Sequence, residues 1–288
     1  MSKKIATREA YGKALSKLAT TNKNVVVLDA DLSKSTKTAD FKAVAPERFF
    51  NMGIAEANMM GVAAGMSTCG KIPYVSTFAM FAAGRAFEQI RNSICYPNLN
   101  VKICATHAGL TVGEDGATHQ SVEDISLMRS IPNMTVINPS DAIETEQVIK
   151  AISEINGPCY VRLGRMAVAN VNDEATYKFQ LGKGVTLAEE GINVRVINIH
   201  TIKPIDEEII IKAAKETKAI VTAEEHSIIG GLGSAVAEVV TENCPVIVKK
   251  VGINDCFGES GKPNELLVRY GLTAENIVKN VKEAIKLK

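Results

Sequence analysis

The stretch KICATHAGLTVGEDGATHQSVED, residues 102–124, starts as an apolar strand and continues into a loop dense in reactive side chains. The loop carries His107 and His119, two of only four histidines in the chain, and the acids Glu114 and Asp115 between glycines. A short apolar strand that opens on a polar loop is typical of a buried parallel sheet. Ligands of such sheets bind beyond the carboxyl ends of the strands, so the loop is the first candidate for a functional site.

Strand and helix patterns alternate on both sides of this stretch. The apolar spacing of residues 7–21 and 55–69 predicts helices, and the run VVVLDAD at 25–31 predicts a buried strand. Further strands are expected at 49–53, 72–78, 101–107, 135–138 and 158–164, and further helices at 80–93, 122–129 and 142–155. This alternation predicts an α/β fold with a parallel sheet and right-handed connections.

Residues 167–187 lose the periodicity and are polar, so we expect a linker between two units, 1–166 and 188–288. The second unit also alternates, with strands expected at 194–199, 219–223 and 246–251 and helices at 206–216, 232–243, 264–270 and 274–286. Its glycine cluster GGLGS, 230–234, opens a helix and serves either tight packing or an anion at the helix N-terminus. The expected fold class is therefore α/β, with two three-layer domains built on parallel sheets.

Composition excludes several classes of function. A chain of 288 residues with 46% hydrophobic and 23% charged residues is long enough for two packed domains. The formal net charge of +1 offers no field for nucleic acid or an anionic membrane, so neither partner is expected. The six scattered cysteines form no CxxC pair, which favours free thiols in a reducing compartment, and no signal peptide is recognisable. We expect a cytoplasmic protein.

Several side chains near the predicted strand ends allow both a structural and a functional interpretation. Glu56 opens the helix at 55–69, either as a surface acid that complements the helix dipole or as a buried functional carboxyl. Phe78 and Phe81 either pack in the core or stack on a flat ligand. Asp31 and Ser35 lie at or beyond the end of the strand at 25–31, where a ligand site is expected. The structural alternative is a helix cap formed by Asp31 or Ser33.

The loop itself suits proton exchange near neutral pH with a substrate rich in hydroxyl or carbonyl groups, because it combines imidazoles, acids and glycines. A metal site at His107, Asp115 and His119 matches no standard ligand spacing, and an ordered loop with capping acids is the structural alternative. Gly61 and Gly65, inside the helix at 55–69, predict the close approach of another backbone, within the chain or across a subunit interface.

Taken together, these segments resemble a family, the transketolases, and specifically the C-terminal subunit of a split, two-chain form. The resemblance runs over nearly the whole chain and rests on the following strings: ATREAYGKAL, LDADLSKST, RFFNMGIAEANMMGVAAG, THAGLTVGEDGATHQSVEDI, HTIKP and EEHSIIGGLGSAVAE. It implies a pyrimidine-binding domain followed by a transketolase C-terminal domain. It also implies transfer of a two-carbon ketol unit between sugar phosphates with thiamin diphosphate as the cofactor.

The resemblance implies partners as well. The family motif that holds the metal and the diphosphate, GDG followed by a later Asn, is absent from this sequence. The chain is therefore expected to bind the pyrimidine end of the cofactor, while an N-terminal subunit holds the magnesium or calcium ion, and a second copy of the chain is an expected partner. Relatives of another kind remain as alternatives: a deoxyxylulose-phosphate synthase-like or pyruvate dehydrogenase beta-like subunit, or a catalytically silent assembly subunit.

By the resemblance, Glu56 hydrogen-bonds the aminopyrimidine ring of the cofactor and is catalytic together with His107 and His119. The residues implied to line the cofactor site are Glu56, Asp31, Ile54, Phe78 and Phe81. Those implied to bind substrate are Arg8, Ser35, His107, Asp115, His119 and Arg165. No metal ligand is expected in this chain.

One departure concerns the second unit. Leu187 runs directly into Ala188, where the family has a further strand and most of a helix. The strand expected at 194–199 should then be exposed or paired differently. Because the implied site residues all precede this junction, we expect the consequence to fall on domain stability and assembly more than on chemistry.

Overall fold

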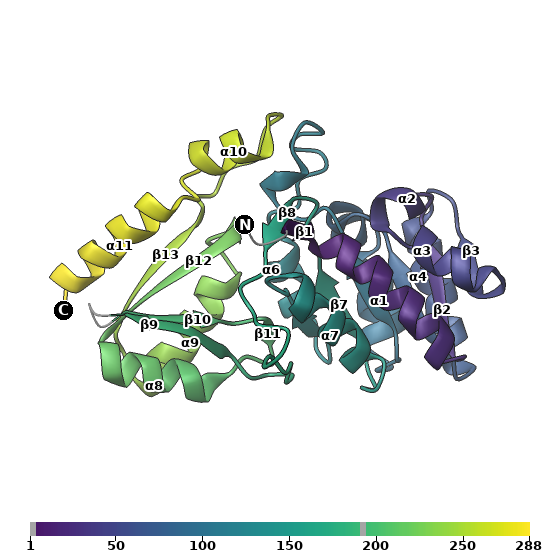
Figure 1. Cartoon of the computed structure of the whole chain (residues 1–288), viewed down its shortest axis with the longest axis horizontal. Coiled ribbons are helices and arrows are strands. Elements are labelled where there is room, and N and C mark those ends of the chain that lie inside the picture. Colours follow the sequence, from purple (N-terminus) through teal and green to yellow (C-terminus); the bar gives the residue numbers. More distant parts are fainter. Residues whose placement is uncertain (1–3, 191–193) are drawn as a thin grey trace.

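The computed structural model describes residues 4–190 and 194–288, and its chain forms two α/β units side by side. In Figure 1 the first unit, purple to teal, surrounds a large sheet, and the second, green to yellow, spreads around two narrow ribbons of strands. The expected α/β class is confirmed. Within the described residues, no helix is both long and apolar enough to cross a membrane.

A seven-stranded sheet organises the first unit. Its strands, in spatial order, are β11 (Thr201–Lys203), β6 (Thr135–Ile137), β7 (Cys159–Arg162), β5 (Lys102–Ala105), β4 (Ile72–Ser76), β2 (Val25–Asp29) and β3 (Phe49–Asn51). Every neighbouring pair is parallel except β11 with β6. The parallel strands direct their carboxyl ends to one edge, which brings the loops after β2, β4 and β5 together as predicted.

Helices cover both faces of this sheet. On one face α1 (Thr7–Thr21) packs against α3 (Ala39–Val44) and α7 (Ala142–Ile152), and their apolar side chains form a core with alternate residues of the strands. On the other face α4 (Glu56–Thr68) and α6 (Asp124–Arg129) bury a second core that includes Met59 and Met60. The expected three-layer arrangement is present here.

The helix expected at 80–93 differs in detail. Two π-helical turns, η2 (Phe81–Arg85) and η3 (Ile90–Cys95), flank the short helix α5 (Phe87–Gln89). The apolar spacing of the segment does not distinguish the wider turn from an α-helical one. Such turns are frequent at functional sites.

The second unit carries two separate pairs of strands. The parallel pair β12 (Ala219–Ser227) and β13 (Ile247–Ile253) is covered by α9 (Leu232–Asn243) and α11 (Ala274–Lys286). The pair β9 (Val185–Glu190) and β10 (Val194–Asn198) is antiparallel, and α8 (Glu207–Thr217) packs against α9. The remaining helix, α10 (Pro263–Arg269), lies close to the loop of residues 107–121.

The strand β10 confirms that the chain is paired in an unusual way after residue 187. Among the described residues it bonds to β9 and not to β12. A cavity of about 220 Å³ lies between the two ribbons, lined by Ile197 and Asn198 from one and by Ala223 and Glu224 from the other. In the described residues, two separate ribbons therefore take the place of the single parallel sheet expected for this unit.

The segment expected as a linker contains short strands. β8 (Ala167–Ala169) pairs with β1 (Lys4–Ala6), and β9 begins at Val185. Beyond it, β11 belongs in sequence to the second unit but extends the sheet of the first. The two units are therefore joined by backbone hydrogen bonds, and the division at 167–187 stays a prediction.

Candidate active site

Four aromatic rings meet beyond the ends of β4 and β5. Phe78 stacks on His107 with ring centroids 3.8 Å apart, and on Phe81 at 5.8 Å. His119 meets Phe81 edge-on at 5.2 Å. The structure thus brings together four residues predicted from the sequence, which come from two separate stretches of the chain, 78–81 and 107–119.

His107 is buried and its backbone is strained. Its φ of 57° lies in the left-handed region, which is uncommon for residues other than glycine and which functional sites often retain. Arg8 Nη1 lies 3.3 Å from Nε2, and Thr106 Oγ1 lies 2.9 Å from Nδ1. Because a guanidinium can only donate, Nε2 must accept, so the ring proton is on Nδ1.

The charge state of His107 follows from its surroundings. Burial, with further contributions from Arg8, Arg165 and His119, lowers the pKa of His107 from 6.5 to about 3. Desolvation disfavours the imidazolium, and the nearby cations add to the penalty. At neutral pH this side chain is an uncharged imidazole.

Arg8 joins two of the predicted substrate-binding positions. Its Nη1 donates to the Ser35 carbonyl oxygen at 2.8 Å as well as facing His107. Its Nε is buried and has no hydrogen-bond partner among the described atoms. Arg165 is close enough to lower the pKa values of both Arg8 and His107. An unused guanidinium donor beside a second arginine suits an anionic group of a ligand.

The turn that carries Ser35 is held by Asp29. The buried carboxylate of Asp29 accepts from the Leu32 amide at 2.6 Å and from the hydroxyls of Thr36 at 2.6 Å and Thr38 at 2.8 Å. The short helix α2 (Ser33–Thr36) has no side-chain cap, so the helix-cap alternative for Asp31 or Ser33 is wrong. Desolvation raises the pKa of Asp29 despite these donors.

Glu56 is a buried carboxyl at the start of α4. Only 4% of its side chain is exposed, so the surface alternative for this residue is wrong. Arg85 Nη1 donates to Glu56 Oε1 at 3.0 Å, and the same guanidinium lies over the Phe81 ring, 4.1 Å from its centroid. Arg85 was not predicted, and its spacing of four residues from Phe81 is the sequence signal that relates the two.

Three predicted residues lie apart from this cluster. Asp31 pairs with Asn51, whose Nδ2 donates to Asp31 Oδ1 at 2.8 Å, while Asp115 is exposed on the loop and Ile54 is 76% exposed before α4. In the described parts of the chain, no hydrogen bond, ion pair or ring contact links them to the aromatic cluster. Arg165 hydrogen-bonds the Val112 carbonyl at the base of the same loop.

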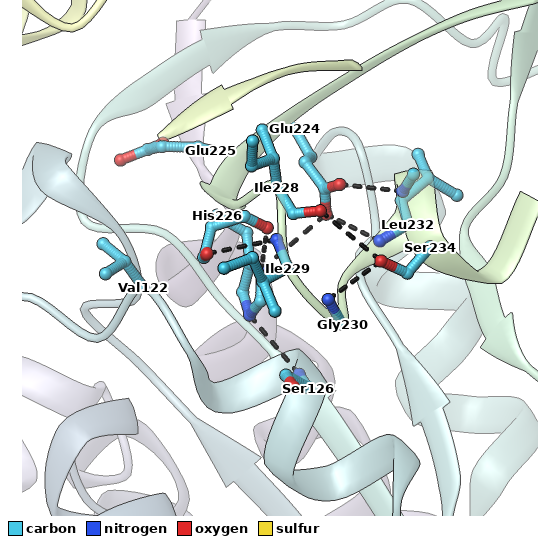
Figure 2. A network of polar contacts seen from close by, with 12 residues as sticks. Val122, Ser126, Glu224, Glu225, His226, Ile228, Ile229, Gly230, Leu232 and Ser234 are labelled. Atoms are coloured by element: carbon cyan, nitrogen blue, oxygen red, sulfur yellow. Dashed lines mark hydrogen bonds and ion pairs between the residues drawn. The ribbon is translucent and has the colours of Figure 1, made fainter. Parts of the chain in front are cut away.

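The glycine cluster 230–234 does not leave an anion site. Figure 2 shows Glu224 reaching the start of α9, where its carboxylate accepts from the Leu232 amide at 2.7 Å and the Gly233 amide at 2.8 Å. A Cβ on Gly233 would stand 2.8 Å from Thr222 Oγ1. The packing interpretation is therefore confirmed, and the chain supplies its own anion.

Among the described residues, no group of three His, Cys, Asp or Glu side chains is arranged to hold a metal ion. His107, Asp115 and His119 therefore do not form a metal site in this structure.

Comparisons with known proteins identify the family of the chain. The model of the transketolase pyrimidine-binding domain matches residues 3–170, and that of the transketolase C-terminal domain matches residues 184–277. A protein of Methanocaldococcus jannaschii named as a transketolase C-terminal section is 50% identical, over 97% of this chain and 96% of its own length. A 6-deoxy-6-sulfo-D-fructose transketolase subunit of a Clostridium species is 40% identical, over 98% and 95% respectively.

A solved structure described as a split-gene transketolase in an inactive β4 tetramer superposes with a TM-score of 0.91. It is 55% identical in sequence and covers 99% of both chains. The alignments with the two relatives run over 306 positions, more than the 288 residues here, so both relatives carry residues that this chain lacks. The chain belongs to the transketolase family, of which it carries the pyrimidine-binding and C-terminal domains.

Proposed function

We propose that this chain is the C-terminal subunit of a two-chain transketolase, which moves a two-carbon ketol unit between sugar phosphates and is active only with an N-terminal subunit. The observation that carries the proposal is the convergence of a buried carboxyl, Glu56, with stacked aromatic rings and the uncharged His107 beyond the strand ends.

The residues around Glu56 fit the aminopyrimidine ring of thiamin diphosphate. The Glu56 carboxylate and the face of Phe81 together hold the guanidinium of Arg85, which is flat and rich in nitrogen. They therefore offer the acceptor and the ring face that a flat pyrimidine requires. When bound, the cofactor supplies the nucleophilic carbon that breaks and forms carbon–carbon bonds next to a carbonyl.

Each site residue then has a physical task. Glu56, shielded from water, holds a proton in a hydrogen bond to a ring nitrogen. His107 and His119 face the reacting carbonyl and the hydroxyls of the sugar, and Asp115 adds an acceptor at the tip of the loop. His107 stays uncharged because burial lowers its pKa to about 3, so it contributes as a fixed dipole.

The phosphate of the substrate has a separate place. Arg8 Nε is a buried donor without a partner among the described atoms, and Arg165 adds a second cation near it. Ser35 is tied to Arg8 through its carbonyl, which leaves its hydroxyl available. We assign the phosphate to these three residues, and Asp31 and Ile54 to the border of the cofactor site.

The diphosphate and its metal ion belong, in this proposal, to the N-terminal subunit. Supporting this, Ile54 is 76% exposed, and nothing in the described structure lies within 4 Å of a Cβ placed on Gly61 or Gly65. This open face of α4 fits a second copy of the chain or the N-terminal subunit. The solved relative that contains only β subunits is described as inactive, in agreement with a need for both chains.

The test reconstitutes the chain with a matching N-terminal subunit, thiamin diphosphate and magnesium, and measures ketol transfer from xylulose 5-phosphate. Glu56→Gln should lower the turnover by about 10²–10⁴-fold, because the amide cannot hold the transferred proton. Glu88→Gln is the matched control, since Glu88 is an exposed acid bonded to Gln89 and Asn92.

If the wild-type enzyme transfers ketol units no faster than the background rate, although both subunits are folded and associated, the proposal is refuted. The chain would then have a role in assembly alone. Pyruvate decarboxylation in the same mixture would instead assign the chain to another class of thiamin enzyme.

A further inference from the structure

The loop of residues 107–121 is closed at its base by the first unit. Ala108 and Ser121 form an isolated parallel bridge, and the Gly109 amide donates to the Ser121 carbonyl at 2.8 Å. Between these points the chain makes one 3₁₀ turn, η4 (Leu110–Val112), and continues to the exposed tip with Asp115. The closed base fixes where the loop leaves the sheet. Two side chains of the first unit hold the carbonyl side of η4: Arg165 donates to the Val112 carbonyl, and Gln120 Nε2 donates to the Leu110 carbonyl at 3.1 Å.

Glu225, on β12 of the second unit, reaches the start of that turn. Its Oε1 accepts from the Thr111 amide at 2.7 Å, and its Oε2 lies 3.3 Å from Thr111 Oγ1. The carboxylate caps amides that a turn beginning at Gly109 leaves without partners, as an acid does at a helix N-terminus. Burial raises the pKa of Glu225, and Arg162 and the Thr111 donors oppose that rise.

Gly109 is the residue that permits this approach. Its φ is 81°, and a Cβ at this position would stand 2.3 Å from Glu225 Oε1. No side chain larger than hydrogen fits without moving the carboxylate.

A second contact fixes the backbone of Glu225 relative to the loop. Arg162 Nη2 donates to the Glu225 carbonyl at 2.9 Å and lies 3.4 Å from the Ser121 carbonyl oxygen. The Nε of the same arginine donates to the buried carboxylate of Asp124 at 2.9 Å. Two residues further along β12, the Ser227 amide donates to the Val122 carbonyl at 2.7 Å. These contacts fix the position of β12 relative to the end of the loop. The side chain of Glu225 is thereby held at the start of the loop.

We propose that Glu225 is a positioning residue: it orients the turn at Leu110–Val112, and through it the loop tip with Asp115 and His119, for the substrate. This inference rests on the proposed function, since it assigns that loop to the substrate. Glu225 touches no reacting atom, and its effect passes through the backbone of Thr111. A displacement of about 1 Å at catalytic groups costs up to about 100-fold in rate, so a cap at the base of the loop has a measurable effect.

The neighbouring Glu224 provides a matched control. It is also a carboxylate on β12 with two backbone amide donors, but those amides open α9 inside the second unit. Glu224→Ala should therefore destabilise that unit without touching the loop. Glu225→Gln keeps an acceptor oxygen for the Thr111 amide and should partly restore what Glu225→Ala removes.

The first measurement is hydrogen exchange of the unmixed chain, read for residues 108–121 by mass spectrometry. Glu225→Ala should speed exchange at this segment by about tenfold, because an uncapped amide opens more readily, while Glu224→Ala should speed exchange only near residues 231–235. Unchanged exchange at 108–121 in Glu225→Ala, or an equal rise in Glu224→Ala, would overturn the inference.

The second measurement uses the reconstituted enzyme. Glu225→Ala should lower kcat/KM for the sugar phosphate by about tenfold or more, with cofactor affinity unchanged and with Glu225→Gln between it and the wild type. Equal kcat/KM in Glu225→Ala and Glu224→Ala would show a merely structural role. If the wild type itself has no turnover, the proposed function fails, and the exchange measurement alone decides whether Glu225 holds the loop.

Discussion

The uncharged state of His107 makes a prediction about stability against pH. The folded pKa of about 3 lies below the ordinary value of 6.5, so the unfolded chain takes up a proton first as the pH falls. Below pH 6.5 protonation of His107 therefore lowers the free energy of the unfolded state but not that of the folded state. The contribution of His107 to stability should fall by about 1.4 kcal/mol for each pH unit until the folded pKa is reached.

The measurement compares urea unfolding of the wild type and His107→Gln at pH 7, 6, 5 and 4.5. All other carboxyls and imidazoles titrate in both proteins, so the difference between the two pH slopes isolates His107. The variant loses ring stacking at every pH, and the comparison therefore uses slopes and not absolute values. Parallel slopes would refute the neutral assignment.

Direct titration by NMR supplies a second measure. The chain has only four histidines, and His107→Gln identifies one signal by its loss. That signal should not titrate above about pH 5. Removing the nearby cation with Arg8→Met should raise the pKa of His107 while leaving it below 6.5, because burial is the larger cause. A titration of His107 near 6.5 in the wild type would contradict both the burial and the tautomer argument.

Two further predictions concern packing. Arg162→Met leaves the buried carboxylate of Asp124 without its cation and should lower the free energy of unfolding, measured in urea, by about 3–5 kcal/mol. The control Lys17→Met removes an exposed ion pair and should lower it by about 1 kcal/mol or less. Equal losses in the two variants would contradict the argument. Gly61→Ala should stabilise α4 in the unmixed chain by about 1 kcal/mol, because the added Cβ meets nothing within 4 Å. The same variant should weaken self-association of the chain in sedimentation experiments. Unchanged association would argue against an interface at Gly61.

The sequence predicts the first unit well because its signals are local. The helix Thr7–Thr21 agrees residue for residue with the apolar spacing, and the strand β2 ends two residues before the predicted limit. The difference arises at Asp29, whose side chain turns inward to hold the next turn. The sequence does not show whether a carboxylate at a strand end faces a ligand or the backbone of its own chain.

The site shows the limit of local signals more sharply. The residues Phe78, Phe81, His107 and His119 were identified because each lies near the end of a predicted strand or belongs to an unusual loop. Arg85 was not predicted as a site residue, because its partner Glu56 is 29 positions away. Glu225 is 114 positions from Thr111, and no periodicity relates two residues at that separation.

The two ribbons of the second unit do not contribute equally to the position of the loop. Among the described residues β10 does not bond to β12, yet β12 keeps its register against the first unit through Arg162 and the Ser227 amide. The contact that orients the loop therefore depends on β12 and not on the sheet as a whole. A change that shifts β12 would reach Thr111 directly through the Glu225 carboxylate.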